Sequence, residues 1–131
     1  MILEVAPFAK PRMTQRDRWA KRQVVKDYFA FRDTVKQEIK RLLASQNNEI
    51  RRGKEKTWEE LDIGFFIPMP KSWSKKKRSE MAGTPHKQRP DLDNYIKGLL
   101  DALLEEDCKV WRVSARKIWV DTEGCITINR C

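Results

Sequence analysis

Residues 89–105 read RPDLDNYIKGLLDALLE, and this stretch decides the central part of the fold expected for the chain. Pro90 disfavours helix at the residue before it, and Asp91 or Asp93 can cap a helix that begins just after it. Beyond this point apolar residues cover a broad arc at helical spacing, and polar residues share the opposite arc. We therefore predict a helix over residues 93–105 with two carboxylates at its start.

A buried strand and another helix are predicted before this stretch. Residues 61–68, LDIGFFIP, form an apolar run that ends at a proline, which is typical of a buried strand. Residues 27–45 repeat apolar side chains at three- and four-residue spacing, which predicts a helix with one buried face. That face consists of Tyr28, Phe31, Val35, Ile39 and Leu42.

The two ends of the chain are expected to add strands. Residues 2–9 predict a first strand, which Pro7 favours at an edge or a strand end. Residues 109–120 and 123–129 predict two more strands, joined by a short turn. The expected order is β-α-β-α-β-β, which suggests a two-layer α+β domain with its helices packed on one face of a mixed sheet. The length of 131 residues predicts a single domain, residues 1–131.

Basic residues gather in two segments of the chain, whose net charge is +9. Residues 10–26 hold seven Lys/Arg against one acid, and residues 71–89 repeat that ratio. This pattern indicates a polyanionic partner such as nucleic acid, although a solvated basic surface would have the same composition. Residues 71–90 are expected to form a long basic loop, with room for a short helical turn over Lys75–Met81. Long loops in compact domains are usually functional or disordered.

The cysteines and the apolar runs limit the class of protein. Cys108, Cys125 and Cys131 form no close pairs, and with the single His86 they make no known zinc spacing. We therefore expect reduced thiols in a cytoplasmic protein. Residues 1–12 have no signal-peptide pattern, and no apolar run is long enough to span a membrane, so no membrane partner is expected.

The acids beside the predicted helix suggest metal chemistry next to the basic loop. Asp91 and Asp93 are two positions apart, and in an extended lead-in such side chains lie on the same side and can share one metal ion. Asp107 can return to the same place if the strand after the helix packs beside it. Mg²⁺ prefers oxygen ligands of this kind, and Lys97 could bind the scissile phosphate of a nucleic acid. The sequence therefore suggests a metal-dependent nuclease site.

These residues also have structural interpretations. Asp at a helix start usually caps the helix, and Asp93 with Lys97 could form only a surface pair. Asp101 fits that role better than catalysis, pairing with Lys97. His86 is interpreted as a loop residue or a phosphate contact. Among the tryptophans, Trp73 could stack on a base or anchor its loop, and Trp19 is similar. The other three indicate core or interface positions: Trp58, Trp111 and Trp119.

The chain resembles the RusA family of Holliday-junction endonucleases over nearly its whole length. Its most specific block is Arg89-Pro90-Asp91-Leu92-Asp93-Asn94, which goes well beyond a lone pair of aspartates. The other residues that carry the resemblance are 67–78, Gly83–His86, Lys97, Leu100–Leu103, Glu106, Asp107 and Val110, with Pro11–Thr14, Tyr28 and Arg32 before them.

The resemblance implies a homodimeric, Mg²⁺-dependent resolvase that nicks four-way DNA junctions symmetrically, with Mn²⁺ as a substitute metal. Asp91, Asp93 and Asp107 would be its catalytic, metal-binding acids, and Lys97 its essential lysine. The family usually has two aspartates where this chain has Glu106 and Asp107, so Glu106 becomes the candidate if the register slips by one. A two-fold dimer would present one site to each of two symmetric strands, and the C-terminal hairpin is one candidate interface.

The expected DNA contacts come from both basic segments. They are Lys71, Trp73, Lys75, Lys76, Lys77, Arg78 and Arg89, helped by Arg12, Arg16 and Arg18. One rival interpretation is a non-catalytic nucleic-acid-binding module whose acids are caps and ion pairs. Another is a nuclease for forks or flaps. A need for Mg²⁺ in cutting would separate an enzyme from a binding module.

Overall fold

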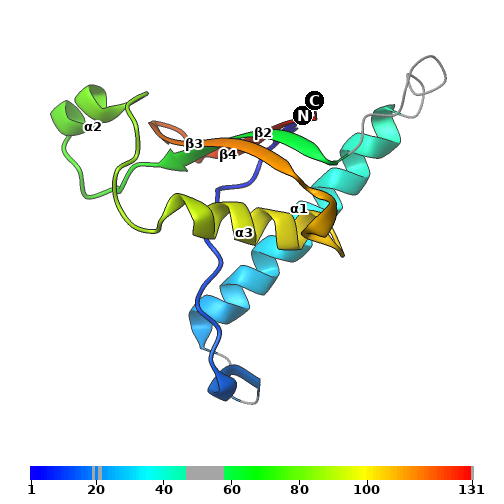
Figure 1. Ribbon diagram of the computed structural model, residues 1–131. Helices are drawn as coiled ribbons and strands as arrows, with labels where there is room; N and C mark the ends of the chain where they lie inside the picture. Colours follow the sequence, from blue (N-terminus) through cyan, green and yellow to red (C-terminus); the bar gives the residue numbers. More distant parts are fainter. Residues whose placement is uncertain (19, 21, 47–57, 131) are drawn as a thin grey trace.

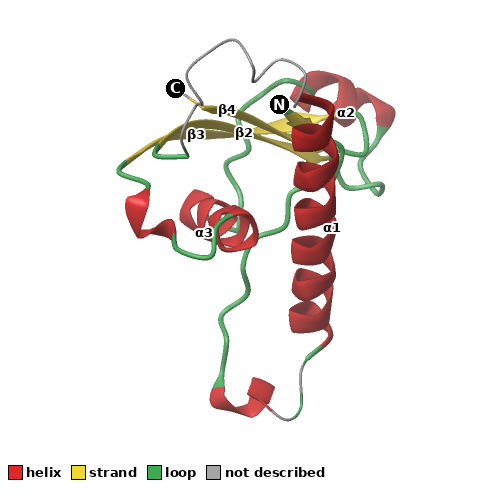
Figure 2. Cartoon of the chain, turned by 90° about the vertical axis from the view of Figure 1, so that its right-hand side faces the viewer, coloured by secondary structure: helices red, strands yellow, loops and turns green. Residues whose placement is uncertain are grey.

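A four-stranded sheet covered on one face by two helices forms the body of the protein (Figures 1 and 2). The computed structural model describes residues 1–18, 20, 22–46 and 58–130. The predicted role of Trp19 therefore lies outside the described residues. In chain order the elements are β1 (Ile2–Leu3), the 3₁₀ helix η1 (Gln15–Arg18), α1 (Gln23–Gln46), β2 (Glu60–Pro68), α2 (Lys75–Met81), α3 (Leu92–Leu103), the 3₁₀ helix η3 (Asp107–Lys109), β3 (Arg112–Val120) and β4 (Cys125–Arg130).

The sheet has the strand order β1-β4-β2-β3 and is mixed. β2 pairs in parallel with β3 and antiparallel with β4, and β4 pairs antiparallel with β1. A parallel pair needs a long crossover, and α2 and α3 provide it between β2 and β3. β3 and β4 are joined by a tight turn at Gly124, whose positive φ of 87° favours glycine. The prediction of an α+β fold with a mixed sheet is confirmed.

The core lies between the sheet and helices α1 and α3. From the sheet, Leu61, Ile63 and Phe65 of β2 are almost completely buried. The predicted apolar face of α1 is confirmed, since Tyr28, Phe31 and Val35 are buried and Ile39 and Leu42 pack against the core. On α3 the buried residues are Tyr95, Gly98, Leu99, Leu100 and Ala102. None of the described helices is long and apolar enough to cross a membrane.

The N-terminal segment corrects one prediction. The first strand ends at Leu3, so the expectation of a strand over residues 2–9 is wrong beyond that point. The chain instead leaves the sheet and crosses the helices, where the Phe8 ring stacks on Phe31 with centroids 5.9 Å apart. A Cβ on Gly98 would lie 2.9 Å from the Phe8 carbonyl oxygen, so glycine permits this close crossing. The apolar run was packed against helices rather than paired in a strand.

Other boundaries shift by a few residues. Helix α1 begins at Gln23 rather than at residue 27, and α3 covers Leu92–Leu103 rather than 93–105. The last two strands begin at Arg112 and Cys125, because residues 107–109 form η3. Helix α2 occupies the turn allowed at Lys75–Met81, so the order gains a helix and becomes β-α-β-α-α-β-β. Trp119 is buried, but Trp111 is 68% exposed and is therefore no core residue.

Candidate active site

Asp91 and Asp93 stand at the N-terminal end of α3 with free carboxylates. Asp91 occupies the N-cap position in extended backbone, yet its side chain makes no capping hydrogen bond. Asp93 lies in the first turn. Both are exposed, and neither side chain forms a hydrogen bond or an ion pair with another described residue. The capping interpretation is wrong for Asp91, and both carboxylates are available as oxygen ligands.

Lys97, one turn beyond Asp93, is surrounded by carboxylates. Its Nζ donates a hydrogen bond to Asp107 Oδ2 at 2.9 Å and pairs with Asp101 Oδ1 at 3.2 Å. The hydrogen bond from Asp107 is the main reason that the pKa of Lys97 is raised above its ordinary value. The predicted pairing of Asp101 with Lys97 is confirmed. The ammonium is therefore held charged and in place at the surface of α3.

A lysine from the N-terminal segment joins this cluster. The Lys10 ammonium pairs with the other oxygen of Asp101, and the Lys10 backbone N–H donates to the Asn94 carbonyl at 3.0 Å. Burial works to raise the pKa of Asp101, but hydrogen bonds from Lys10 and Lys97 outweigh it and hold that pKa below its ordinary value. Asp101 thus stays ionised and holds both ammonium groups. Lys10 was not among the predicted site residues.

Asp107 reaches Lys97 because the chain turns back after α3. The helix ends in extended backbone at Leu104, and Asp107 then begins η3. Glu106 is exposed and makes no contact with Lys97 in the described structure. The geometry thus favours Asp107 over Glu106 as the acid beside the lysine, the choice made from the aligned register.

The three candidate acids are not gathered into one ligand cluster. Within the described residues, no group of three or more His, Cys, Asp or Glu side chains is arranged to hold a metal ion. Asp107 instead contacts the ammonium of Lys97, which supplies positive charge to that carboxylate. The donor set still suits Mg²⁺, because this ion takes hard oxygen ligands and keeps several waters, so that few carboxylates are needed.

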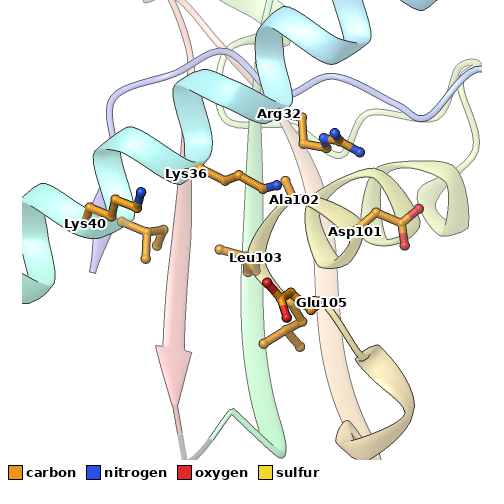
Figure 3. A pocket seen from close by; sticks show the side chains of 9 residues that line it. Arg32, Lys36, Lys40, Asp101, Ala102, Leu103 and Glu105 are labelled. Atoms are coloured by element: carbon orange, nitrogen blue, oxygen red, sulfur yellow. The ribbon is translucent and has the colours of Figure 1, made fainter.

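Two cavities border the cluster. The first has a volume of about 510 Å³ and is lined by Asn94 and Lys97 of α3 and by residues 10–13. The second, of about 640 Å³, lies between α1 and the C-terminal end of α3 (Figure 3). Its α1 side carries Arg32, Lys36 and Lys40, and its α3 side carries acids and a helix C-terminus that complement those cations. We therefore assign the second cavity a structural role.

The basic segment that contains α2 is anchored to the sheet. Trp73 packs on Trp119 with ring centroids 4.8 Å apart, and the Lys77 ammonium lies 4.2 Å from the centre of the Trp73 ring. Arg78 donates to the Asp121 carboxylate at 2.7 Å. These contacts support the anchoring interpretation of Trp73. The predicted DNA contacts that are exposed and have no partner in the described structure are Lys71, Lys75, Lys76 and Arg89.

The first basic segment is built around a buried acid. Asp17 accepts hydrogen bonds from Thr14 and from the Arg22 guanidinium, and chiefly the Arg22 bond holds the pKa of Asp17 well below its ordinary value. Arg16 and Arg18 flank Asp17 and are exposed. Arg12 is exposed as well, so the three predicted arginines of this segment can reach a ligand.

His86 is a buried residue rather than a surface contact. It is 5% exposed, and its ring packs 4.2 Å from the ring centre of Trp119. Its Nδ1 has no hydrogen-bond partner among the described residues. Burial lowers the pKa of His86, which keeps the ring neutral. The interpretation of His86 as a phosphate contact is therefore wrong.

A comparison with known proteins identifies the family. The family described as Endodeoxyribonuclease RusA matches residues 4–129. The chain belongs to this family of endodeoxyribonucleases. The family match includes all the candidate acids and Lys97, so the cluster on α3 and η3 lies inside the shared domain.

One curated relative matches a shorter stretch. It is the uncharacterized protein YqaN of Bacillus subtilis (strain 168), which is 43% identical over 47 residues, covering 33% of each chain. The match thus spans about a third of that relative's length. No solved structure gives a significant match.

Proposed function

We propose that this chain is a Mg²⁺-dependent endonuclease that resolves Holliday junctions by paired, symmetric nicks in DNA recombination and repair. One observation carries the proposal: Lys97 of α3 contacts Asp107 of η3, one turn away from the free carboxylate of Asp93. A module that only binds DNA gains nothing from carboxylates facing phosphate. In a family of endodeoxyribonucleases, this set of acids and a lysine supports cleavage.

The metal would be held by Asp91, Asp93 and Asp107. When bound, Mg²⁺ supplies charge stabilisation on the phosphate and an activated water, and Mn²⁺ would do the same. Asp91 and Asp93 bring oxygens that no other described side chain occupies. Asp107 brings an oxygen that Lys97 holds in a fixed direction.

Lys97 would neutralise charge that develops on the scissile phosphate. Its ammonium is oriented by Asp101, which makes Asp101 a positioning residue. The N-terminal end of α3 adds partial positive charge on the same side as Asp93. A fixed cation and a helix terminus both act without reorganising as the charge develops.

The exposed cations of the two basic segments would bind the phosphates on either side of the cut. A homodimer would place two such sites in two-fold symmetry, which matches the two symmetric strands of a four-way junction. Sedimentation of the purified protein should accordingly give the mass of a dimer.

The test compares wild type with Asp93→Asn on a labelled four-way junction, scoring binding without metal and cleavage with Mg²⁺. We expect wild type to make paired symmetric nicks, and Asp93→Asn to bind normally while cutting more than about a hundredfold more slowly. Even groups that only support metal ligands are worth about 10–100-fold. Asp33→Asn on the exposed side of α1 is the matched control and should cut like wild type.

Two results would contradict the proposal. If wild type binds the junction and cuts with neither Mg²⁺ nor Mn²⁺, a non-catalytic binding module explains the protein better. If wild type cuts a fork or a flap much faster than the junction, the enzyme is a nuclease for those substrates.

A further inference from the structure

Lys117 of β3 makes two hydrogen bonds that the function described above does not use. Its Nζ donates to the carbonyl oxygens of Gln88 and Pro90, each at 2.9 Å. Both acceptors belong to the segment that leads into α3, and Pro90 is the residue directly before Asp91. A strand residue distant in sequence therefore holds the backbone next to a candidate metal ligand.

The position of Lys117 on the sheet is unusual for a lysine. It is the register partner of Phe65, whose ring packs 5.5 Å from the ring centre of Tyr95 of α3. Register partners lie on the same face of a sheet, so the side chain of Lys117 lies on the face that the helices cover. An apolar residue is the usual choice there. The partly buried stem leaves the ammonium at the edge, where it reaches the two carbonyls.

The segment that Lys117 holds has few other ties. Within the described residues, the two bonds from Lys117 are the only hydrogen bonds that residues 87–90 make. Downstream, the Asp91 carbonyl accepts from the Asn94 N–H at 3.1 Å, but the Asp91 carboxylate is free. The position of that carboxylate thus depends on the backbone on either side of it.

Lys117 itself stands on a rigid element. β3 is paired in parallel with β2 along its whole length. Its outer edge also binds residues 83–86, through bonds that join Gly83 to Trp119 at 2.8 Å, Trp119 to Thr84 at 3.0 Å and His86 to Lys117 at 3.0 Å. A charged donor on such an element can fix a loop more exactly than a donor on another loop.

We propose that Lys117 is a positioning residue for Asp91. Its ammonium fixes residues 88–90 against β3 and thereby sets where Asp91 presents its oxygens to the metal. The inference rests on the proposed function, since it needs Asp91 to be a metal ligand. With two of its three hydrogens donated to carbonyls, the ammonium has one left for a phosphate.

The experiment compares wild type with Lys117→Met, Lys117→Arg and the matched control Lys87→Met. Methionine keeps the length of the stem and removes the donors. Lys87 lies in the same segment, is exposed and makes no side-chain hydrogen bond in the described structure. Three quantities are measured: amide hydrogen exchange over residues 87–94, Mn²⁺ affinity by electron paramagnetic resonance, and the salt dependence of junction binding without metal.

We expect Lys117→Met to speed exchange in residues 87–94 while α1 exchanges as before. Mn²⁺ affinity should fall about 10–100-fold, the usual cost of losing a group that orients a ligand. The salt dependence of junction binding should not change. Lys117→Arg should restore part of the protection and of the affinity, and Lys87→Met should leave both at the wild-type level.

Unchanged exchange and Mn²⁺ affinity in Lys117→Met would overturn the proposal. So would a drop of about 0.9 in the salt slope with unchanged exchange, which would make Lys117 a phosphate contact. If Asp91→Asn keeps the Mn²⁺ affinity and cleavage of wild type, the role of Asp91 fails and the inference fails with it. If Asp91→Asn loses both and Lys117→Met loses neither, only the positioning role is wrong.

Discussion

Residues 71–89 and residues 10–26 each carry seven lysines and arginines against one acid, yet their cations have different partners. In the first of these segments Arg78 pairs with Asp121 and Lys77 lies over Trp73, which leaves the other described cations on a surface fixed to the sheet. In the second, Lys10 and Arg22 are paired with acids. Equal charge therefore does not mean equal numbers of cations free to bind.

The two segments also differ in what holds them. Residues 71–89 are held through Trp119, on which both Trp73 and His86 pack, and through backbone bonds to the edge of β3. The turn around Asp17 is held by hydrogen bonds to one carboxylate. The first segment is anchored by apolar burial and the second by charge, which makes separate responses to mutation, salt and pH expected.

The largest effect should come from removing the apolar anchor. Trp119→Ala should lower the free energy of unfolding by about 3–5 kcal/mol, because it empties a buried site on which two rings pack. The measurement is urea unfolding followed by circular dichroism. Trp111→Ala on the same side of the chain is the matched control, since Trp111 is 68% exposed. It should change stability by less than about 0.5 kcal/mol. Equal losses would mean that Trp119 anchors nothing.

A smaller effect is expected from neutralising the cations themselves. Lys75→Gln with Lys76→Gln should lower the salt slope of junction binding by about 0.9 for each lost phosphate contact. Arg16→Gln with Arg18→Gln should weaken binding less, because a segment already fixed to the sheet needs less ordering when DNA binds. Binding without metal is measured over a range of salt concentrations. If the two double variants lose the same affinity, anchoring by the sheet has no bearing on DNA binding.

The smallest effect separates the two anchors by pH. The native pKa of His86 lies below its ordinary 6.5, so the unfolded state binds the proton first as the pH falls through 6.5. Stability should therefore be highest above that pH and fall below it, by at most about 1.4 kcal/mol per pH unit. Asp17 has a native pKa below its ordinary 3.8, so its contribution is present above 3.8 and is lost only at lower pH.

Urea unfolding at a series of pH values checks this ordering. His86→Gln should flatten the dependence just below pH 6.5, and Asp17→Asn should flatten it below 3.8. Each variant should leave the other pH range unchanged. A His86→Gln protein with the wild-type slope near pH 6 would show that the ring titrates normally in the folded state.

Local patterns in the sequence predicted the elements best. Helix α2 was predicted at Lys75–Met81, where Ser74 caps it by accepting a bond from the Lys77 N–H at 3.2 Å. The buried strand β2 and the pairing of Asp101 with Lys97 were predicted as well, because both depend on spacing within one element. The end of β1 was not, since an apolar run fits a strand and a segment packed on helices equally well.

The contacts that complete the site lay beyond such reasoning. Lys10 meets Asp101 across 91 residues, and no spacing rule connects them. Lys117 follows Arg116 in a strand, where a lysine is normally taken as solvated. Asp107 was predicted near the helix, but its contact with Lys97 depends on how the chain turns at Leu104. These are properties of the tertiary fold.

The crossing of the N-terminal segment over α3 has a consequence for synthesis. Lys10 leaves the ribosome early, but Asn94, to whose carbonyl it donates, and Asp101, with which it pairs, follow only after most of the chain has been made. Contacts so far apart in sequence close slowly and late. The carboxylate that orients Lys97 therefore gains its second partner near the end of folding. A nascent chain would stay unable to cut DNA until nearly all of it has emerged.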